Sequence, residues 1–311
     1  MYKIGNVKLE NNLMLAPLHG VSCNAFRLIC KKHGAGLVYT SMIHDETLIR
    51  RKWACDVVDE EGPIAIQLVG KNPEKMSEAA KIVEEKADII DINLGCPDQD
   101  VLANQAGAFL IKHPEQMVKM VSKVVSSVSK PVTAKIRIGW DTKSINAVEV
   151  SKMLEDCGVA AIAVHGRTRK QMYTGKANWD VIKQVKEIVN VPVIGNGDIF
   201  EAEDYIRMIE KTKVDFVMIG RGAMGNPHLF ENCLRLVEGK ELIEKDLKLA
   251  YDMFSEFVNY YDKYSTRNIF SEIRQHAMWF AKGVKNGAVL KNQLIKIQDI
   301  NELKKVFENF E

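Results

Sequence analysis

A cysteine and an asparagine at the end of one apolar segment are the residues best placed to do chemistry. Residues 89–97 read Ile-Ile-Asp-Ile-Asn-Leu-Gly-Cys-Pro, which presents Asn93 and Cys96. The isoleucines favour a stiff, buried strand, and Gly95 and Pro97 favour its abrupt end. Cys96 is therefore predicted at the carboxyl end of a strand, where parallel α/β proteins build their sites. A cysteine taken alone is more often an inert apolar side chain, so its role depends on the elements around it.

The composition is typical of a folded protein of one large and one small domain. The 311 residues are 46% hydrophobic and 27% charged. No apolar run approaches the roughly 18 residues of a membrane span, and residues 1–10 lack the apolar core of a signal sequence. The six cysteines include no C-x-x-C pair, so neither a metal site nor a disulfide framework is predicted. We expect a cytoplasmic protein without a membrane partner.

Eight short runs rich in valine, isoleucine and leucine recur along most of the chain. They span residues 13–18, 37–43, 64–69, 89–94, 131–138, 160–164, 192–194 and 214–219. Each is followed by a segment with helical periodicity, as in 73–86 and 114–128. The runs are continuously apolar, which is typical of a parallel sheet covered on both faces. Eight strand-then-helix units in roughly 225 residues predict an α/β fold of the (β/α)8 TIM barrel type.

The remainder of the chain has helical patterning. Helices are predicted over 246–264, 267–282, 291–297 and 299–309. We therefore predict two domains, a catalytic barrel over 1–238 and a smaller all-helical domain over 239–311. The stretch 263–296 is basic, with Glu272 as its one acid; its cations are Lys263, Arg267, Arg274, Lys282, Lys285, Lys291 and Lys296. A solvated helix face explains such a stretch, and the nearby Tyr264, Trp279 and Phe280 leave a nucleic-acid surface as the alternative.

Several predicted strands end in residues that suit a bound phosphate and a planar ring. The first strand ends in Ala16-Pro17-Leu18, and the last two are followed by Asn196-Gly197-Asp198 and Gly220-Arg221-Gly222. Barrels commonly bind phosphate after strands seven and eight. With Gln67 on the third strand, Lys135 on the fifth and His165 on the sixth, this set predicts flavin mononucleotide (FMN) across the barrel mouth. Lys135 is expected near the flavin N1 and O2 edge and Gln67 at the pyrimidine edge.

The spaced motifs resemble those of the tRNA-dihydrouridine synthases over essentially the whole chain. They are Met14 to Arg27, Asn93-Leu94-Gly95-Cys96-Pro97 with Gly107-Ala108, Lys135 to Trp140, His165-Gly166-Arg167-Thr168-Arg169 through Gly175, Asn196-Gly197-Asp198, Gly220-Arg221-Gly222, and Arg274-Gln275-His276 with Trp279. Their number and spacing make a chance agreement implausible.

The resemblance implies a reaction and a set of residue roles. FMN, reduced by NADPH, gives a hydride from N5 to C6 of a uracil, and Cys96 protonates C5 as general acid. Asn93 holds the uracil edge, and Arg167 and Arg169 are assigned to the RNA substrate. The implied flavin contacts are Ala16, Pro17, Leu18, Gln67, Lys135, His165, Asn196, Gly197, Asp198, Gly220 and Arg221. The partner is tRNA, whose target base must leave the folded RNA, and the helical domain grips that RNA. We expect a monomer.

The chain also departs from the family pattern near the mouth. Asp98 and Asp100 follow the cysteine where basic residues are common, and such acids should repel phosphate. Ser41 replaces an acid in the second strand, and Ser22 replaces an aspartate after the first strand. Leu18 takes a frequent methionine position, which is a mild change for packing.

Two alternatives stay open beside the reduction of a tRNA uridine. One is a flavin barrel that oxidises or reduces a small molecule, in the manner of dihydroorotate dehydrogenases, although the basic helical segment argues against it. The other is an RNA-binding protein on the same scaffold that has lost turnover, which the acids at 98 and 100 allow.

Overall fold

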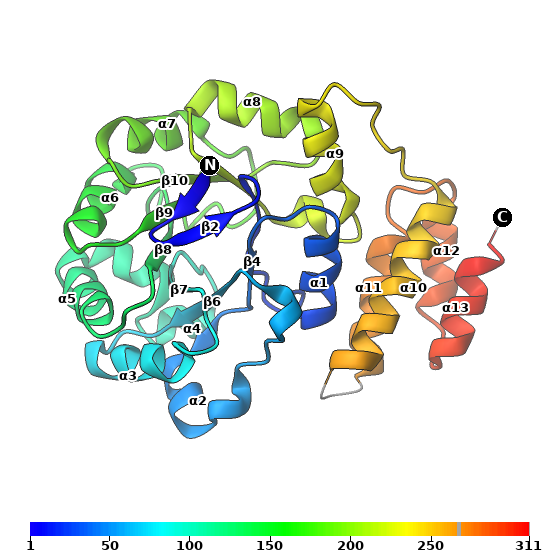
Figure 1. Cartoon of the computed structure of the whole chain (residues 1–311), viewed down its shortest axis with the longest axis horizontal. Helices are drawn as coiled ribbons and strands as arrows, with labels where there is room; N and C mark the ends of the chain where they lie inside the picture. Colours follow the sequence, from blue (N-terminus) through cyan, green and yellow to red (C-terminus); the bar gives the residue numbers. More distant parts are fainter. Residues whose placement is uncertain (266–268, 311) are drawn as a thin grey trace.

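A (β/α)8 barrel with a helical C-terminal region makes up the protein, as the sequence predicts. The computed structural model describes residues 1–265 and 269–310. Within them, eight parallel strands pair in the order β3-β11-β10-β9-β8-β7-β6-β4. A parallel bridge between Met14 and Leu37 closes the ring. Figure 1 shows the helices around the barrel and the C-terminal helices packed against one side of it.

The barrel strands follow the predicted runs. They are β3 (Leu13–Leu15), β4 (Val38–Tyr39), β6 (Ile64–Val69), β7 (Ile89–Leu94), β8 (Val132–Arg137), β9 (Ala161–His165), β10 (Val193–Asn196) and β11 (Phe216–Ile219). The helices of the barrel are α1 (Asn24–Lys32), α2 (Asp45–Arg50), α3 (Pro73–Val83), α4 (Gln99–Ala103), α5 (Pro114–Val125), α6 (Ala147–Asp156), α7 (Trp179–Ile188), α8 (Ala202–Thr212) and α9 (His228–Val237). Short 3₁₀ turns are η1 (Lys52–Ala54), η2 (Asp59–Glu61), η3 (Gly107–Lys112) and η4 (Arg221–Ala223).

Strand alternation divides the barrel interior into an apolar lower part and a polar upper part. The lower part is filled by Met14, Leu37, Tyr39, Ala65, Ile89, Ala161, Ala163, Ile194, Phe216 and Met218, all buried. The hairpin β1 (Tyr2–Ile4) and β2 (Val7–Leu9) closes this end with Ile4 and Leu9. Because side chains on one face recur every second residue, the next inward positions on the same strands point to the open end. The polar residues at the strand ends are therefore brought together there.

The second strand is shorter than predicted. The sequence suggested one run over 37–43, but the structure has β4 and then β5 (Ile43–His44), and both pair with β6. At the break, the hydroxyl of Thr40 accepts the hydrogen bond of the Gln67 backbone N–H at 3.0 Å. A side-chain oxygen thus takes the place of a backbone acceptor in the strand ladder. The hydropathy pattern does not indicate such a replacement, so the sequence did not predict the break.

Four helices follow α9 within the described residues, close to where the sequence places them. They are α10 (Leu247–Tyr264), α11 (Phe270–Phe280), α12 (Gly287–Leu294) and α13 (Ile300–Glu308). The predicted bounds 291–297 were wrong for α12. The helix begins earlier because Asn286, with a left-handed φ of 56°, precedes its first turn. Residues 267–268 of the predicted helix 267–282, and with them Arg267 of the basic stretch, lie outside the described residues. The boundary at residue 238 stays a prediction.

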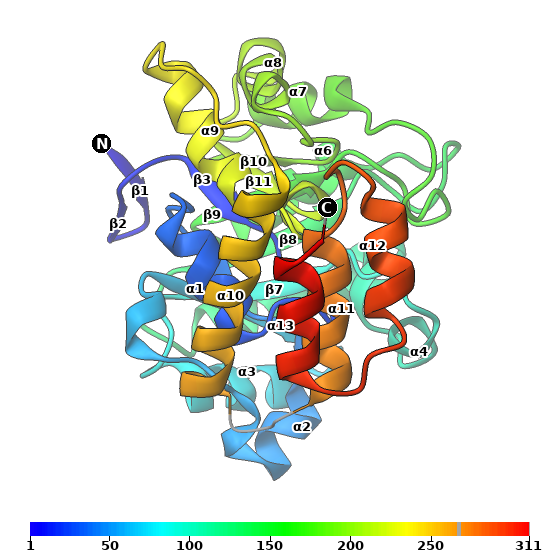
Figure 2. The ribbon, with the colours of Figure 1, turned by 90° about the vertical axis from the view of Figure 1, so that its right-hand side faces the viewer.

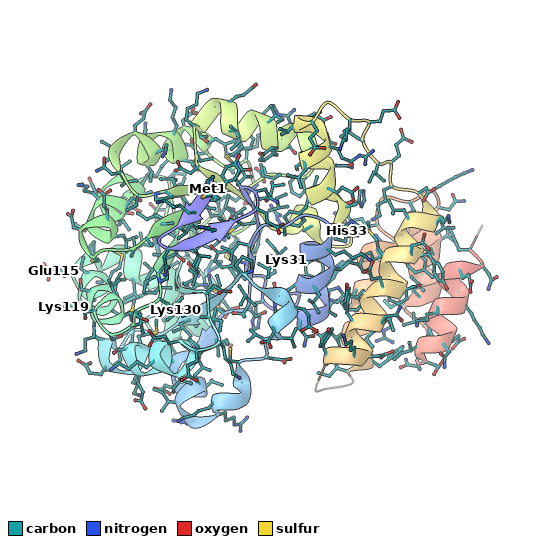
Figure 3. All side chains as sticks on the ribbon, viewed as in Figure 1. Met1, Lys31, His33, Glu115, Lys119 and Lys130 are labelled. Atoms are coloured by element: carbon teal, nitrogen blue, oxygen red, sulfur yellow. The ribbon has the colours of Figure 1, made fainter. Side chains whose placement is uncertain are left out.

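The C-terminal helices share one apolar core with the barrel. Helix α10 packs along α1, and the ring of Phe26 on α1 lies 5.4 Å from the ring of His276 on α11. Lys245, just before α10, donates hydrogen bonds to the carbonyls of Gly225 in the barrel and Lys282 beyond α11. Figure 3 labels Lys31 and His33 at the end of α1, beside this junction. The helical region is therefore fixed against the barrel through buried contacts.

In the part of the chain that the structure describes, no helix combines the length and the apolar character required to cross a bilayer.

Arg27 forms a buried ion pair that ties α1 to η2. Its guanidinium donates to Glu61 at 2.8 and 3.1 Å and to the carbonyls of Ser22 and Asp56. Removing one partner of a buried pair leaves an uncompensated charge, so Arg27→Ala should lower the free energy of unfolding by roughly 3–5 kcal/mol in urea titrations. The exposed pair of Arg50 with Glu46 is the control, and Arg50→Ala should cost below about 1 kcal/mol. Equal losses in both variants contradict the expectation.

Candidate active site at the barrel mouth

One cavity lies at the carboxyl ends of the barrel strands and collects the residues that the sequence singles out. Its volume is about 120 Å³, and it opens at the mouth. Of the predicted residues it is lined by Ala16, Pro17, Leu18, Gln67, Asn93, Cys96, Lys135, His165, Asn196, Gly197, Asp198, Gly220 and Arg221. Arg167 and Arg169 are absent from this lining. The sequence did not single out Met42, Arg137, Tyr173 and Phe200 as site residues, and these also face the cavity.

The loop that carries Cys96 is held by the side chain of Asn93. The Oδ1 atom of Asn93 accepts hydrogen bonds from the backbone N–H groups of Gly95 at 3.1 Å and Cys96 at 2.8 Å. The carbonyl of Cys96 accepts from the N–H of Ala108. Burial, with a contribution from the charge of Asp98, raises the pKa of the Cys96 thiol above its ordinary value. The thiol therefore keeps its proton at neutral pH.

Lys135 is a cation in a desolvated position. Its Nζ donates to Oδ1 of Asn196 at 3.2 Å, and Asn196 in turn donates to the carbonyl of Met218. Burial and the nearby charge of Arg137 lower the pKa of Lys135 to about 8. Asn93 and Lys135 are register partners on neighbouring strands, so both side chains start from the same level of the barrel interior. A half-buried ammonium whose pKa is lowered in this way favours a ligand that brings negative charge.

The loops after β10 and β11 form the side of the cavity that is rich in glycine and positive charge. At Gly222 an added Cβ would lie 2.1 Å from the carbonyl of Ile199, and at Gly197 it would lie 2.8 Å from Ala177, so both positions require glycine. Arg221 lies over the rings of Tyr173 and Phe200. Burial and the surrounding cations lower the pKa of His165 well below its ordinary value, so this imidazole is neutral.

Ser22 and Ser41 hold the loop after the first strand with their side chains. The hydroxyl of Ser22 accepts the hydrogen bond of the Leu18 N–H at 3.0 Å. The hydroxyl of Ser41 donates to the Leu18 carbonyl at 3.1 Å. Both backbone groups of Leu18 are thereby satisfied, and Leu18 is fixed where it lines the cavity. Neither serine lines that cavity.

Arg167 and Arg169 lie behind the cavity wall. Arg167 is buried and binds both carboxylate oxygens of Asp198, at 2.6 and 2.9 Å, as well as the carbonyls of Thr174 and Gly175. Arg169 stacks on the ring of Trp140 and reaches the carbonyl of Pro97 at 3.5 Å, next to the cysteine. Both arginines therefore stabilise loops that surround the site. Their contact with the substrate stays a prediction.

Arg137 and Tyr173 are the most informative residues that the sequence reasoning missed. The guanidinium of Arg137 donates to the carbonyl of Gly95 at 2.9 Å and to those of Thr168 and Met172. It also lies 5.5 Å from the centre of the Tyr173 ring. Arg137 thus joins the cysteine loop to the loop after β9. Its place at the end of a predicted strand, two residues after Lys135, was the signal that could have identified it.

The fold and the mouth define a (β/α)8 barrel enzyme with a built ligand site. A family model described as "Dihydrouridine synthase (Dus)" matches residues 14–311. The tRNA-dihydrouridine synthase B of Pasteurella multocida (strain Pm70) is 37% identical over 321 residues, which cover 99% of this chain and 95% of that protein. A probable tRNA-dihydrouridine synthase of Rickettsia bellii (strain RML369-C) is 37% identical over 310 residues, with coverage of 96% and 94%. The chain belongs to the dihydrouridine synthase family.

Solved structures support the fold alone. Histamine dehydrogenase from Rhizobium sp. 4-9 matches with a TM-score of 0.58 and 14% identity, over 83% of this chain and 50% of that one. The old yellow enzyme homologue from Zymomonas mobilis matches with a TM-score of 0.53 and 13% identity, over 78% of this chain and 93% of that one.

Among the described residues, no group of three or more histidine, cysteine, aspartate or glutamate side chains is arranged to hold a metal ion.

The lowered pKa of Lys135 has a measurable consequence. In protein freed of small molecules, the ammonium should lose its proton as the pH rises through about 8, whereas the unfolded chain keeps it up to about 10.5. The unfolded state then binds more protons between these values, so the free energy of unfolding should rise with pH relative to Lys135→Met. Urea titrations of both proteins from pH 7 to 10 measure this difference. A difference that is constant with pH contradicts the expected desolvation.

Proposed function

We propose that the protein reduces a uridine of tRNA to 5,6-dihydrouridine, with FMN as cofactor and NADPH as reductant. One observation carries the proposal. A protonated thiol, Cys96, and a half-buried cation, Lys135, line the same cavity at the mouth of the barrel in a chain of the dihydrouridine synthase family. The tRNA-dihydrouridine synthases named among the relatives support tRNA as the substrate class.

The donor set of the cavity fits FMN. Gly197, Gly220, Gly222 and Arg221, from the loops after β10 and β11, line the cavity together, and glycine backbone beside a guanidinium suits a phosphate. Lys135 has one hydrogen bond, to Asn196, which leaves donors for the anionic N1 and O2 edge of a ring. Ala16, Pro17 and Leu18 supply an apolar wall. We assign Gln67, His165, Asn196, Gly197 and Asp198 to the remaining flavin contacts.

The reaction needs a hydride at C6 of the uracil and a proton at C5. A bound flavin, reduced by NADPH, would supply the hydride. Cys96 supplies the proton from its Sγ, and the raised pKa keeps that proton available at neutral pH. Asn93 holds the backbone of Cys96, and its uracil contact is part of the proposal. Lys135 stabilises negative charge from within the barrel, where the low polarity strengthens the interaction.

The helical region is suited to hold RNA on the same side as the mouth. In Figure 2 the hairpin β1–β2 at the closed end of the barrel lies on the left, and α12 lies on the right, as does α4, which follows Cys96. Lys285, Lys291 and Lys296 flank or belong to α12 and are at least partly exposed. We call them the α12 lysines. They carry positive charge toward a phosphate backbone that approaches the mouth, and they position the RNA without selecting a base.

Replacing Cys96 by alanine tests its role as acid. Cys96→Ala should keep the bound flavin and its rate of reduction by NADPH, and should lose about 10²–10⁴-fold in dihydrouridine formation, because the proton at C5 has no positioned donor. Dihydrouridine in an unmodified tRNA transcript is quantified by mass spectrometry after digestion. Cys157→Ala, at the end of α6, is the matched control. Unchanged turnover in Cys96→Ala removes Cys96 as the acid.

The same assay separates the alternatives. A protein that binds the transcript tightly and shows no tRNA-dependent oxidation of NADPH is an RNA-binding protein on this scaffold. A protein that oxidises NADPH with a small acceptor and leaves the transcript unchanged is a small-molecule oxidoreductase. Either result contradicts the proposed function.

Salt dependence tests the α12 lysines. Replacing Lys285 and Lys296 together by alanine should weaken tRNA binding and reduce the slope of log K against log salt concentration by about one for each lost phosphate contact. Fluorescence anisotropy with labelled transcript at several salt concentrations gives the slope. Lys119→Ala on α5 is the control, because Lys119 lies on the far side of the barrel from the helical region (Figure 3). An equal effect of Lys119→Ala contradicts the assignment.

A further inference from the structure

Asp91 is a carboxylate inside the barrel, directly below the mouth. It lies on β7 two residues before Asn93 and is completely buried. Ala65 and Ile89, which are register partners one inward position below Gln67 and Asp91 on β6 and β7, belong to the apolar cluster of the lower interior. A charge in such a place is expensive to bury without partners. None of the steps assigned above uses it, so its role requires a separate explanation.

A chain of hydrogen bonds leads from Asp91 to the backbone of Cys96. Gln67 donates from Nε2 to Oδ2 of Asp91 at 2.6 Å. Asn93 donates from Nδ2 to Oε1 of Gln67 at 2.8 Å. The N–H groups of Gly95 and Cys96 donate to Oδ1 of Asn93 at 3.1 and 2.8 Å. These four hydrogen bonds connect Asp91, inside the barrel, to the backbone of the loop that carries the thiol.

The two ends of this chain fix the orientation of the amides between them. Backbone N–H groups can only donate, so Asn93 must present Oδ1 to Gly95 and Cys96 and must present Nδ2 to Gln67. Gln67 then accepts at Oε1 and must donate at Nε2. Its acceptor has to be a group that offers a lone pair, and an ionised carboxylate only accepts. Burial raises the pKa of Asp91 to about 6, which leaves the group ionised at neutral pH. Every donor meets an acceptor only in this one arrangement.

We propose that Asp91 is a positioning residue for Cys96, which acts by fixing the amide orientations of Gln67 and Asn93 and, through them, the backbone of the cysteine loop. The proposal rests on the proposed role of Cys96 as the acid. Asp91 touches neither the thiol nor the cavity, since it is absent from the cavity lining. Its effect reaches the reaction only through the two amides.

A second bond of Asp91 provides a matched control. The hydroxyl of Thr133 on β8 donates to Oδ1 of Asp91 at 2.6 Å. This bond is as short as the bond from Gln67, uses the same carboxylate and is equally buried, but it leads away from Cys96. If Asp91 has only a structural role, the loss of either hydrogen bond should affect the protein to the same extent. A positioning role predicts that only the branch through Gln67 reaches the cysteine loop.

The test compares Asp91→Leu, Asp91→Asn and Thr133→Val in the full-length protein as purified. Leucine is close in size and removes the acceptor, so the Gly95 and Cys96 amides should exchange hydrogen about tenfold faster or more, measured by mass spectrometry on a peptide that covers 93–98. In Asp91→Asn the new amide can accept from Gln67 and donate to the Thr133 hydroxyl, so exchange should stay within about threefold of the parent. Thr133→Val should leave exchange at 93–98 unchanged.

Turnover provides the second readout. Asp91→Leu should lower kcat for dihydrouridine formation about tenfold and leave KM for tRNA within about twofold, because the RNA contacts lie elsewhere. Asp91→Asn should recover most of kcat. If Asp91→Leu fails to fold, Gln67→Leu breaks the same chain one link later and should give the same faster exchange.

The outcomes separate the positioning role from the proposed function. If exchange is fast in Asp91→Leu but the parent protein forms no dihydrouridine, Asp91 still positions the cysteine loop and the proposed reaction is wrong. Parent-like exchange at 93–98 in a folded Asp91→Leu or Gln67→Leu variant overturns the positioning role. Equal losses in Asp91→Asn and Asp91→Leu also overturn it, because they assign the effect to the charge of the carboxylate and not to the direction of its hydrogen bond.

Discussion

Desolvation of the polar layer at the top of the barrel is the constraint on which the site depends. The alternation that fills the lower interior with apolar side chains turns Gln67, Asn93, Lys135, His165 and Asn196 toward the open end of the same strands. These side chains and Cys96 are buried or half-buried, and burial raises the pKa of Cys96 and lowers those of Lys135 and His165. The Cys96 thiol keeps its proton and the His165 imidazole stays neutral because both lie in the partly buried layer at the carboxyl ends of the strands.

The sequence predicted the parts of this arrangement that follow from periodicity. Continuous apolar runs indicate a closed parallel sheet, and polar residues directly after them lie at one end of it, which is why Lys135 and His165 could be placed from the sequence. What it missed depends on contacts between distant segments. Arg137 joins the cysteine loop to Thr168 and Met172, and the Thr40 hydroxyl replaces a ladder acceptor. No local pattern records which carbonyl a side chain will reach.

Close packing gives the helical region a fixed position relative to the mouth. Gly225, in the loop that follows η4, approaches the backbone of Trp279 so closely that an added Cβ would lie 2.1 Å from it. Lys245 bridges the same place by donating to the carbonyls of Gly225 and Lys282. A loop next to the cavity is therefore bonded to the end of α11. Under the proposed function, this arrangement sets the distance and the angle at which an RNA held by the helices would meet the mouth.

The acids that follow Cys96 are consistent with this chemistry when their contacts are considered. Asp98 caps α4, since its carboxylate accepts the N–H of Asp100 at 2.9 Å, and a helix N-terminus favours negative charge. The charge of Asp98 also raises the pKa of the Cys96 thiol, while its backbone N–H acts in the opposite direction. A thiol that must donate a proton benefits from an acid beside it, whereas a nucleophilic thiolate would be disfavoured. The charge of Asp98 therefore opposes phosphate next to the cysteine and favours the protonated thiol that the proposed general acid requires.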